Sequence, residues 1–324
     1  MKMKVLVILI CAGLSIAARR SYERYIIEHA EVYFEEFIKT YNKQYADEDE
    51  KLRRFEIFKQ NLEHINRRNL ESDTAEFGIT LFCDLTVEEF LKMYTGLGSF
   101  KENNCDSQTR RFTSASPESF DWREQKKVSK VKNQGACGSC WAFGATGNLE
   151  SQYAIKYNKL VEFSEQQLVD CDERSGGCEG TTDLAYPYMY WMENGAISEE
   201  DYPYEAKGGS CRFDASRIKM NVTGCVSYHA GSEDRLREIL HEVGPLTMVG
   251  AAVVLPRADL IVLPPTKACY KLSHILSVTE DGVPYWTIKN SWGESFGESG
   301  YIKVKRGVNA CGILNVPAVS ARIA

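Results

Sequence analysis

The spacing of apolar residues divides the chain into a charged helical first third and a mixed remainder. From about residue 19 to residue 105 the pattern is helical, and one segment places similar side chains every three or four residues. These positions are Glu50, Arg54, Phe58, Asn61, Ile65 and Asn69. Side chains at this spacing line one stripe of a helix. Taken alone, the stripe predicts an amphipathic helix with an apolar seam and a solvated face.

Helical patterns in the rest of the chain are followed by strand patterns. We expect helices over Ser139 to Tyr157, Ser164 to Asp170 and Ser232 to Val243. We expect strands over Leu246 to Leu255, Leu272 to Thr279, Tyr285 to Ile288 and Tyr301 to Lys305. The order of these elements predicts an α+β fold of two lobes, one mainly helical and one an antiparallel, barrel-like sheet.

The first residues are typical of a secretory signal peptide. Two lysines precede the apolar run from Val5 to Leu14, and small residues follow it up to Ala18. That run is too short to span a membrane, and the sequence has no longer one. We therefore expect a signal peptide at residues 1–18, passage through the secretory pathway, and a lysosomal or extracellular location.

Composition narrows the classes of function. The 324 residues suffice for two domains, or for one two-lobed enzyme with an accessory segment. A net charge of −6 without a basic tract argues against a nucleic-acid partner. The chain has 11 cysteines, and an oxidising route favours disulfides for most of them. Asn221 begins an Asn-Val-Thr sequon, which is either a glycosylation site or an unmodified polar position. We expect a monomer without a metal or organic cofactor.

A glycine-rich stretch ending at Cys140 carries the strongest chemical signal. It runs from Asn133 into an apolar, helix-compatible segment, so Cys140 is expected at a helix N-terminus. The positive end of a helix stabilises a thiolate, the nucleophilic form of cysteine. Cys137 and Cys140 also form a Cys-x-x-Cys pair, which zinc and redox sites use. Such sites need a second ligand pair or a thioredoxin-like context, and the sequence downstream shows neither.

Several motifs resemble one protease family. The run from Gln134 to Trp141 resembles the active-site segment of papain-like cysteine proteases. The six-residue helical stripe is similar to the ERFNIN signature of cathepsin L-like inhibitory propeptides and matches it at every position. The segment from Gly78 to Asp84 resembles the shorter motif that follows, with Thr80 in place of Asn and an unexpected Cys83. Parts of the prosegment and of residues 309–312 are similar to the cathepsins of insect-infecting large DNA viruses.

The resemblance implies a self-inhibited zymogen. Residues Gly98 to Pro117 form a polar linker with Arg110-Arg111, and Asp121-Trp122-Arg123 resembles the start of a mature papain-like enzyme. We expect the mature N-terminus between Ser114 and Pro117. The predicted divisions are a helical inhibitory propeptide at residues 19–115 and a papain-like peptidase domain at residues 116–324.

A cysteine nucleophile needs a base, and the predicted mature part has three histidines. His241 lies on a charged helix and is expected at the surface, while His229 lies beside a turn. His274 lies in an apolar run, where a buried histidine is structural or functional with even odds. The resemblance to papain-like enzymes makes His274 the catalytic base.

Three further residues complete the expected site. Asn290 is suited to orient the imidazole through its amide oxygen, and in papain-like enzymes the Trp at the position of Trp292 shields that bond from water. A solvated turn is the alternative for this motif. The backbone N–H of Cys140 and the amide of Gln134 are suited to an oxyanion hole, although Gln134 as an ordinary loop residue is the alternative.

The remaining cysteines are assigned by similarity, because sequence alone does not fix their connectivity. The resemblance implies the pairs Cys137–Cys178, Cys171–Cys211 and Cys269–Cys311. In the predicted mature part, these pairs and the nucleophile Cys140 leave Cys225, for which we expect a buried thiol.

We therefore expect a cathepsin L-type cysteine endopeptidase that acts on proteins or peptides and is inhibited by its own propeptide. Two departures from the family bear on this hypothesis. Where the family has a Gly-Gly pair of the substrate cleft, either Thr181 replaces the second glycine or one residue is deleted, and residues 246–281 are irregular and contain three prolines. They favour the alternative of a catalytically impaired homologue that acts as a binding or inhibitory protein. A disulfide oxidoreductase that cycles Cys137 and Cys140 is a third hypothesis.

Overall fold

The computed structural model describes residues 25–71, 77–94, 104–108, 116–251, 268–278 and 282–324. For residues 250, 251 and 268–278 it describes the backbone alone.

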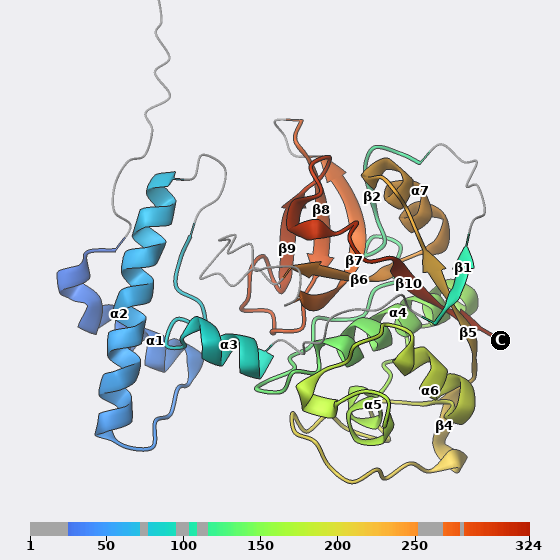
Figure 1. Cartoon of the computed structure of the whole chain (residues 1–324), viewed down its shortest axis with the longest axis horizontal. Coiled ribbons are helices and arrows are strands. Elements are labelled where there is room, and N and C mark those ends of the chain that lie inside the picture. The colour runs from blue at the N-terminus through green and yellow to red at the C-terminus, as the bar shows by residue number, and fades with distance from the viewer. Residues whose placement is uncertain (1–24, 72–76, 95–103, 109–115, 252–267, 279–281) are drawn as a thin grey trace, which may run out of the picture.

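The first part of the chain is helical, as the sequence predicts. A short 3₁₀ turn, Ile27–His29, precedes α1 (Ala30–Tyr41), α2 (Glu48–Glu71) and α3 (Val87–Tyr94). Figure 1 shows α1 and α2 to one side of the molecule, with α3 extending from them towards the rest of the chain. The apolar residues of the α2 stripe, Phe58 and Ile65, are completely buried in a small core that includes Phe34 and Phe37 of α1.

The polar residues of the same stripe hold the chain segment that follows α2. The Arg54 guanidinium lies 2.8 Å from the Glu89 carboxylate at the start of α3. The Asn61 amide donates to the backbone carbonyls of Cys83 (2.8 Å) and Leu85 (3.1 Å). One face of α2 therefore packs against α1 through apolar side chains and fixes residues 83–89 through hydrogen bonds.

Four longer helices follow: α4 (Cys140–Tyr157), α5 (Glu165–Cys171), α6 (Tyr186–Asn194) and α7 (Glu233–Val243). Short 3₁₀ turns lie at Gly177–Glu179, Ala215–Arg217 and Ala310–Gly312. Three of the helices agree with the sequence prediction. The side chains of Ser164 and Ser232 accept hydrogen bonds from backbone N–H groups three residues on, as N-cap residues do. Only α6 was not expected.

The main sheet is antiparallel except for one short edge strand. The described residues form the strands β1 (Asp106–Gln108), β2 (Phe120–Asp121), β3 (Ala196–Ile197), β4 (Ile218–Met220), β5 (Val222–Tyr228), β6 (Leu246–Ala251), β7 (Ala268–Val278), β8 (Pro284–Lys289), β9 (Tyr301–Lys305) and β10 (Ala318–Ile323). The sheet order is β1-β5-β10-β6-β7-β8-β9, with β2 on β7, and β3 pairs with β4 separately. Its described path ends in β1 and β9, so the expected barrel-like sheet is open among the described strands.

Residues 246–281, which the sequence shows to be irregular, still form β-strands in their first and last parts. Six residues of β6 pair with β7, from Leu246 opposite Ser273 to Ala251 opposite Ala268. The three prolines that weaken the strand pattern, at positions 256, 264 and 265, lie outside the described residues.

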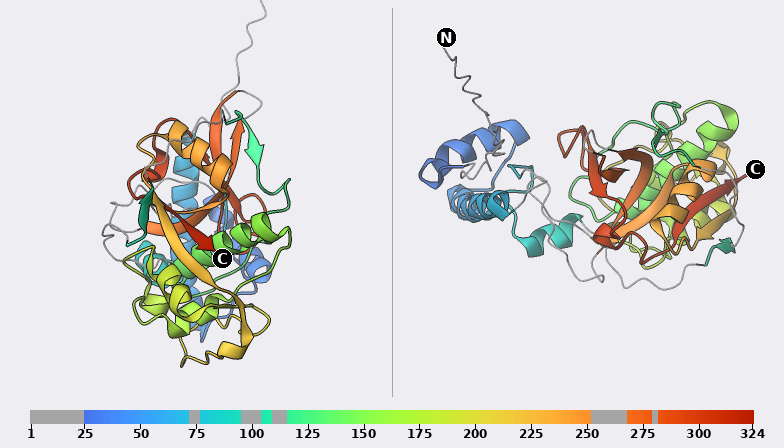
Figure 2. Two further views of the ribbon diagram at one scale, coloured as in Figure 1. Left: turned by 90° about the vertical axis from the view of Figure 1, so that its right-hand side faces the viewer. Right: turned by 90° about the horizontal axis from the view of Figure 1, so that it is seen from above.

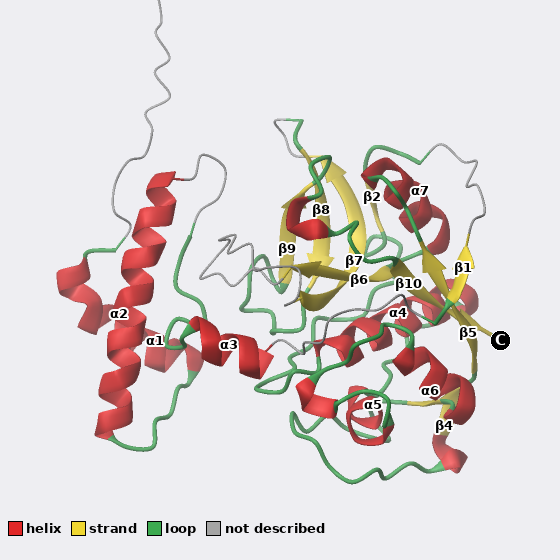
Figure 3. Cartoon of the chain, in the orientation of Figure 1, coloured by secondary structure: helices red, strands yellow, loops and turns green. Residues whose placement is uncertain are grey.

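Helix α4 is the centre of the larger part. Of its 18 residues, twelve are buried. It contacts β6, β7 and β10 on one side and α5 and α6 on the other, which places it between the sheet and the smaller helices (Figures 2 and 3). The expected α+β class, with a helical part and a sheet part, is confirmed.

The disulfides agree with the sequence in two cases and correct it in a third. The structure joins Cys137 to Cys178 and Cys171 to Cys211, as the resemblance implies. The expectation of a buried thiol at Cys225 is wrong, because Cys225 is bonded to Cys105. Strand β1 lies beside β5, which brings the two Cα atoms to 5.0 Å, within disulfide range. The side chain of Cys269 lies outside the described residues, so its pairing with Cys311 stays a prediction.

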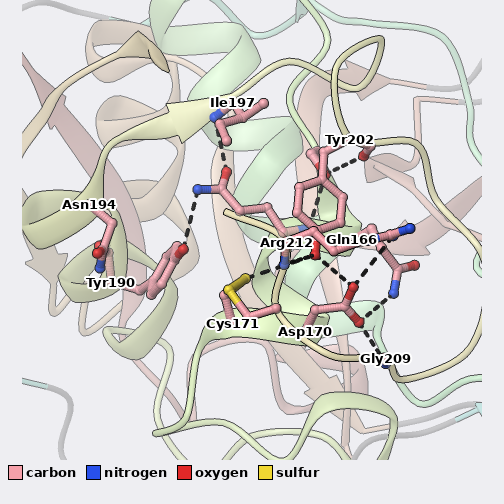
Figure 4. The surroundings of a disulfide bond; sticks show 12 residues. Gln166, Asp170, Cys171, Tyr190, Asn194, Ile197, Tyr202, Gly209 and Arg212 are labelled. Carbon is pink, nitrogen blue, oxygen red and sulfur yellow. Dashed lines mark hydrogen bonds and ion pairs between the residues drawn. A yellow bond between two sulfur atoms is a disulfide. The ribbon is translucent and has the colours of Figure 1, made fainter. Parts of the chain in front are cut away.

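Figure 4 shows how the Cys171 disulfide is supported. The neighbouring Asp170 carboxylate accepts from the Tyr202 hydroxyl at 2.8 Å and from the Gly209 backbone N–H at 2.7 Å. These bonds, together with the disulfide, attach the loop before Cys211 to α5.

Candidate active site

Cys140 is the first residue of α4, and its side chain is completely buried. The preceding loop is fixed by the Cys137–Cys178 disulfide and by a hydrogen bond from the Gly138 N–H to the Cys178 carbonyl at 2.9 Å. The sulfur therefore lies at the positive end of a long helix, where a thiolate is stabilised. Because Cys137 is bonded to Cys178, the Cys137–Cys140 pair is not a zinc or redox dithiol in this state.

The amide of Gln134 is completely buried close to this loop. Its Nε2 donates to the carbonyls of Cys137 (2.8 Å) and of Tyr94 in α3 (3.3 Å). Its Oε1 accepts from the Ser291 hydroxyl at 2.6 Å, and its backbone N–H donates to the Ser291 carbonyl. Gln134 is thus fixed from three directions, and one of its donors already faces a carbonyl of the first part of the chain.

Asn290 and Trp292 lie directly after β8. The Asn290 side chain is buried, and its Oδ1 accepts from the Ser291 N–H at 2.8 Å. Its Nδ2 has no hydrogen-bond partner among the described residues. The indole of Trp292 meets Phe296 edge-on at 4.7 Å and also meets Phe82 (5.0 Å) and Phe90 (5.4 Å). Rings from the helical first part therefore cover the loop that follows β8.

The backbone places His274 on the strand beside β8. The register between β7 and β8 shifts at this residue, with Ser273 opposite Ile288 and Ile275 opposite Thr287. Asn290 lies two residues beyond Ile288, and α4, which begins with Cys140, packs on β7. The side chain of His274 lies outside the described residues.

The other two histidines of this part lie on other elements. His229 is exposed directly after β5, as expected beside a turn. His241 is half-buried on α7, where its ring meets Phe120 edge-on at 4.8 Å.

A buried charged cluster that the sequence did not indicate lies next to Asn290. The Lys132 ammonium lies 2.7 Å from both the Glu150 and Glu165 carboxylates. Lys289 donates to the carbonyl of Ser129 (2.8 Å) and to its hydroxyl (2.9 Å). Burial lowers the pKa of Lys289 to about 8, and burial raises the pKa of Glu165 despite the opposing charge of Lys132. The only sequence signal is a glutamate within the apolar pattern of α4.

Besides this charged cluster, Tyr204 is a residue near Cys140 that the sequence did not indicate. Its hydroxyl donates to the Gln134 carbonyl at 2.8 Å and lies 2.5 Å from the Ser139 hydroxyl. Burial raises the pKa of Tyr204, so the hydroxyl stays protonated and keeps this donor. Tyr204 comes from an irregular loop without a recognisable motif, so nothing in the sequence placed it here.

Thr181, which lies in the stretch that departs from the family's Gly-Gly pattern, turns its side chain inwards. It is buried, and its hydroxyl donates to the Asp183 carbonyl at 3.2 Å and accepts from Ser175 at 3.1 Å. The preceding Gly180 has φ +99°, a value that a side chain disfavours.

Within the described residues, none of the helices combines the length and the apolar composition needed to cross a bilayer.

Family models match most of the chain. The model of papain family cysteine proteases matches residues 116–321, and the model of the cathepsin propeptide inhibitor domain matches residues 34–90. The two models divide the chain where the helical first part ends.

Curated relatives are similar over nearly the whole length. The chain is 43% identical over 316 residues to a viral cathepsin of Mamestra configurata nucleopolyhedrovirus, covering 93% of this chain and 91% of that protein. It is 40% identical over 332 residues to the viral cathepsin of Orgyia pseudotsugata multicapsid polyhedrosis virus, covering 99% of each chain.

Solved structures show the same arrangement of prosegment and enzyme. Digestive procathepsin L 3 of the Tenebrio molitor larval midgut superposes with a TM-score of 0.81 at 31% identity, over 91% of this chain and 99% of that one. A recombinant stem bromelain precursor superposes with a TM-score of 0.81 at 32% identity, over 91% and 99%. The chain belongs to the papain family of cysteine proteases and has the papain-like fold together with a cathepsin-type propeptide.

Proposed function

We propose that this cysteine protease is a cathepsin L-type endopeptidase in which Cys140 is the nucleophile and His274 the base. The carrying observation is the position of Cys140, buried at the N-terminus of α4 with the Gln134 amide beside its loop. The strand position of His274, next to the strand that ends before Asn290, supports the assignment.

The mechanism follows from the chemistry of these groups. His274 takes the thiol proton of Cys140, and the resulting thiolate is stabilised by the imidazolium and by the helix end. The thiolate attacks the peptide carbonyl, and His274 protonates the leaving amine. Water then hydrolyses the acyl-enzyme. Asn290 orients the imidazole, and Trp292 keeps water from that bond.

An oxyanion hole is proposed at the start of α4. The backbone N–H of Cys140 and the Nε2 of Gln134 are the donors suited to a developing oxyanion. In the full-length chain the Tyr94 carbonyl lies 3.3 Å from that Nε2. A substrate carbonyl would have to displace it.

We infer that the full-length chain is a zymogen inhibited by its own prosegment. Phe82 and Phe90 lie on Trp292, and Tyr94 contacts Gln134, so the prosegment covers the proposed site at two points. We propose a signal peptide at residues 1–18, a prosegment at residues 19–115 and a monomeric peptidase domain at residues 116–324. A secretory route to a lysosomal or extracellular location is part of this proposal. Asn221 is exposed, which suits glycosylation on that route.

The test is acid activation of the full chain from a secreting host, followed by hydrolysis of an internally quenched peptide. We expect cleavage at an internal bond by the unsubstituted chain and no cleavage by Cys140→Ala or His274→Ala. Equal hydrolysis by Cys140→Ala, or removal of terminal residues only, would contradict the proposal. Folded and processed protein without hydrolysis would favour the binding or inhibitory homologue.

A further inference from the structure

The Cys105–Cys225 disulfide connects the two functional parts of the chain. Cys105 precedes the expected processing region at residues 114–117, whereas Cys225 lies in β5 of the peptidase domain. We propose that the segment around Cys105 stays on the processed enzyme as a second, disulfide-linked chain, and that a cut in the expected processing region does not release the inhibitory helices without a cut before Cys105. This proposal rests on the zymogen processing proposed above.

The Cys105 segment is also held by contacts other than the disulfide. Strand β1 pairs in parallel with β5 at three positions, from Asp106 opposite Val226 to Gln108 opposite Tyr228. It is the edge strand of the main sheet, so it covers backbone groups of β5 that would otherwise be open.

Side chains add two contacts to other elements. The Asp106 carboxylate lies 2.9 Å from the Arg322 guanidinium of β10. The Asn104 amide donates to the Asp183 carboxylate at 2.9 Å. The Cys105 segment therefore contacts three separate parts of the peptidase domain and belongs structurally to the enzyme, although it lies before the expected mature N-terminus.

Because of the disulfide, cleavage of one peptide bond after Gln108 does not separate the inhibitory helices from the peptidase domain. Hydrolysis of one peptide bond between Gln108 and Ser116 consumes one water and leaves the S–S bond intact. The inhibitory helices then remain tethered, and a short tether keeps an inhibitor at an effective concentration in the millimolar range. Release requires hydrolysis between Tyr94 and Asn104, on the other side of Cys105, and the two cuts together leave the Cys105 segment as a separate, disulfide-linked chain.

The tether can be tested without the chain's own activity. In full-length Cys140→Ala, the recognition sequence of an exogenous protease replaces residues 109–115. After cleavage, thiols are alkylated and the protein is denatured. We expect one species without reductant and two with reductant. Two species without reductant would overturn the proposal.

The matched control adds Cys105→Ser and Cys225→Ser to the same protein, which should give two species under both conditions. Peptide mapping of the unsubstituted chain without reductant makes the test independent of how this control folds. We expect the peptide containing Cys105 linked to that containing Cys225. Alkylation of Cys105 without prior reduction would overturn the proposal.

A second measurement addresses the processed enzyme. We expect the intact mass of the acid-processed, unsubstituted protein to fall on reduction by the mass of a peptide containing Cys105. A mass that changes only by the two hydrogen atoms that reduction adds to each disulfide would overturn the retained second chain. Failure of the chain to process at acidic pH would instead count against the proposed function, and the result with the exogenous protease would be unaffected.

Discussion

At the residue scale, the candidate site contains buried polar side chains that are fixed by several hydrogen bonds each. Gln134 is fixed by Cys137, Ser291 and Tyr94, so its amide donor has one orientation in the zymogen. The sequence motif predicted that Gln134 lies beside the loop before Cys140, because the two residues belong to one short segment. It did not indicate Tyr204, which reaches the same loop from 70 residues further along the chain.

We predict that Gln134→Ala lowers kcat of the processed enzyme by about 10²- to 10³-fold with little change in KM, because one proposed oxyanion donor is lost. Ser291→Ala is the matched control, since it removes the hydroxyl bonded to Oε1 and leaves the donor in place. Peptide hydrolysis measures both. An equal loss of kcat in the two variants would assign Gln134 a structural role instead.

We predict that the Glu199 carboxyl makes the fold more stable at acidic pH than at neutral pH. Burial, together with the nearby Glu165 carboxylate, raises the pKa of Glu199 to about 7, and its Oε2 has no hydrogen-bond partner among the described residues. A raised carboxyl pKa contributes stability that is complete below pH ~4.5 and is lost as pH rises through about 7.

Glu199→Gln cannot ionise, so it should match the parent protein near pH 4.5 and exceed its stability above pH 7. The expected gain is about 1 kcal/mol, since partial exposure reduces the full effect of the shift. Unfolding by denaturant in a Cys140→Ala background, at both pH values, measures it. Glu200→Gln, at the exposed neighbouring residue, is the control. A gain that is the same at both pH values would contradict the assignment.

At the element scale, helices with clear end signals were predicted and elements defined by distant partners were not. Ser164 and Ser232 begin α5 and α7 as N-caps, a signal contained within four residues. Strands β5 and β10 pair with each other across 90 or more residues, so no local pattern identified them. Helix α6 is almost wholly apolar and aromatic, without the alternation that reveals an amphipathic helix.

We predict that Phe90→Ala weakens the prosegment's hold on the enzyme. Phe90 is 1% exposed and lies against Trp292, and removing a buried phenyl ring costs about 3–5 kcal/mol. Val87→Ala is the control, because Val87 lies on the same helix but is 42% exposed. Limited proteolysis of the prosegment in a Cys140→Ala background should be accelerated by the first change only. Unchanged proteolysis in Phe90→Ala would show that α3 does not depend on this contact.

At the scale of the whole molecule, the fold class, the propeptide and the disulfide of the loop before Cys140 were predictable because each is carried by a motif that resembles the family's. The Cys105–Cys225 disulfide was not, because its cysteines are 120 positions apart and adjoin only after β1 pairs with β5. The cluster of Lys132, Glu150 and Glu165 escaped prediction for the same reason. Its charges are separate in sequence, and only folding makes them neighbours.

The central claim is that Cys140 is an activated thiolate, and covalent labelling tests it most directly. The acid-processed protein is treated with an epoxide selective for papain-type thiols, and the adduct is mapped by mass spectrometry. A parallel labelling of the unprocessed protein includes Cys83, a buried thiol whose pKa burial raises to about 12 and which should therefore not react. We predict a single adduct on Cys140, absent in Cys140→Ala and formed much more slowly in His274→Ala, with both variants processed by an exogenous protease. An adduct on another cysteine, or none on folded and processed protein, would contradict the claim.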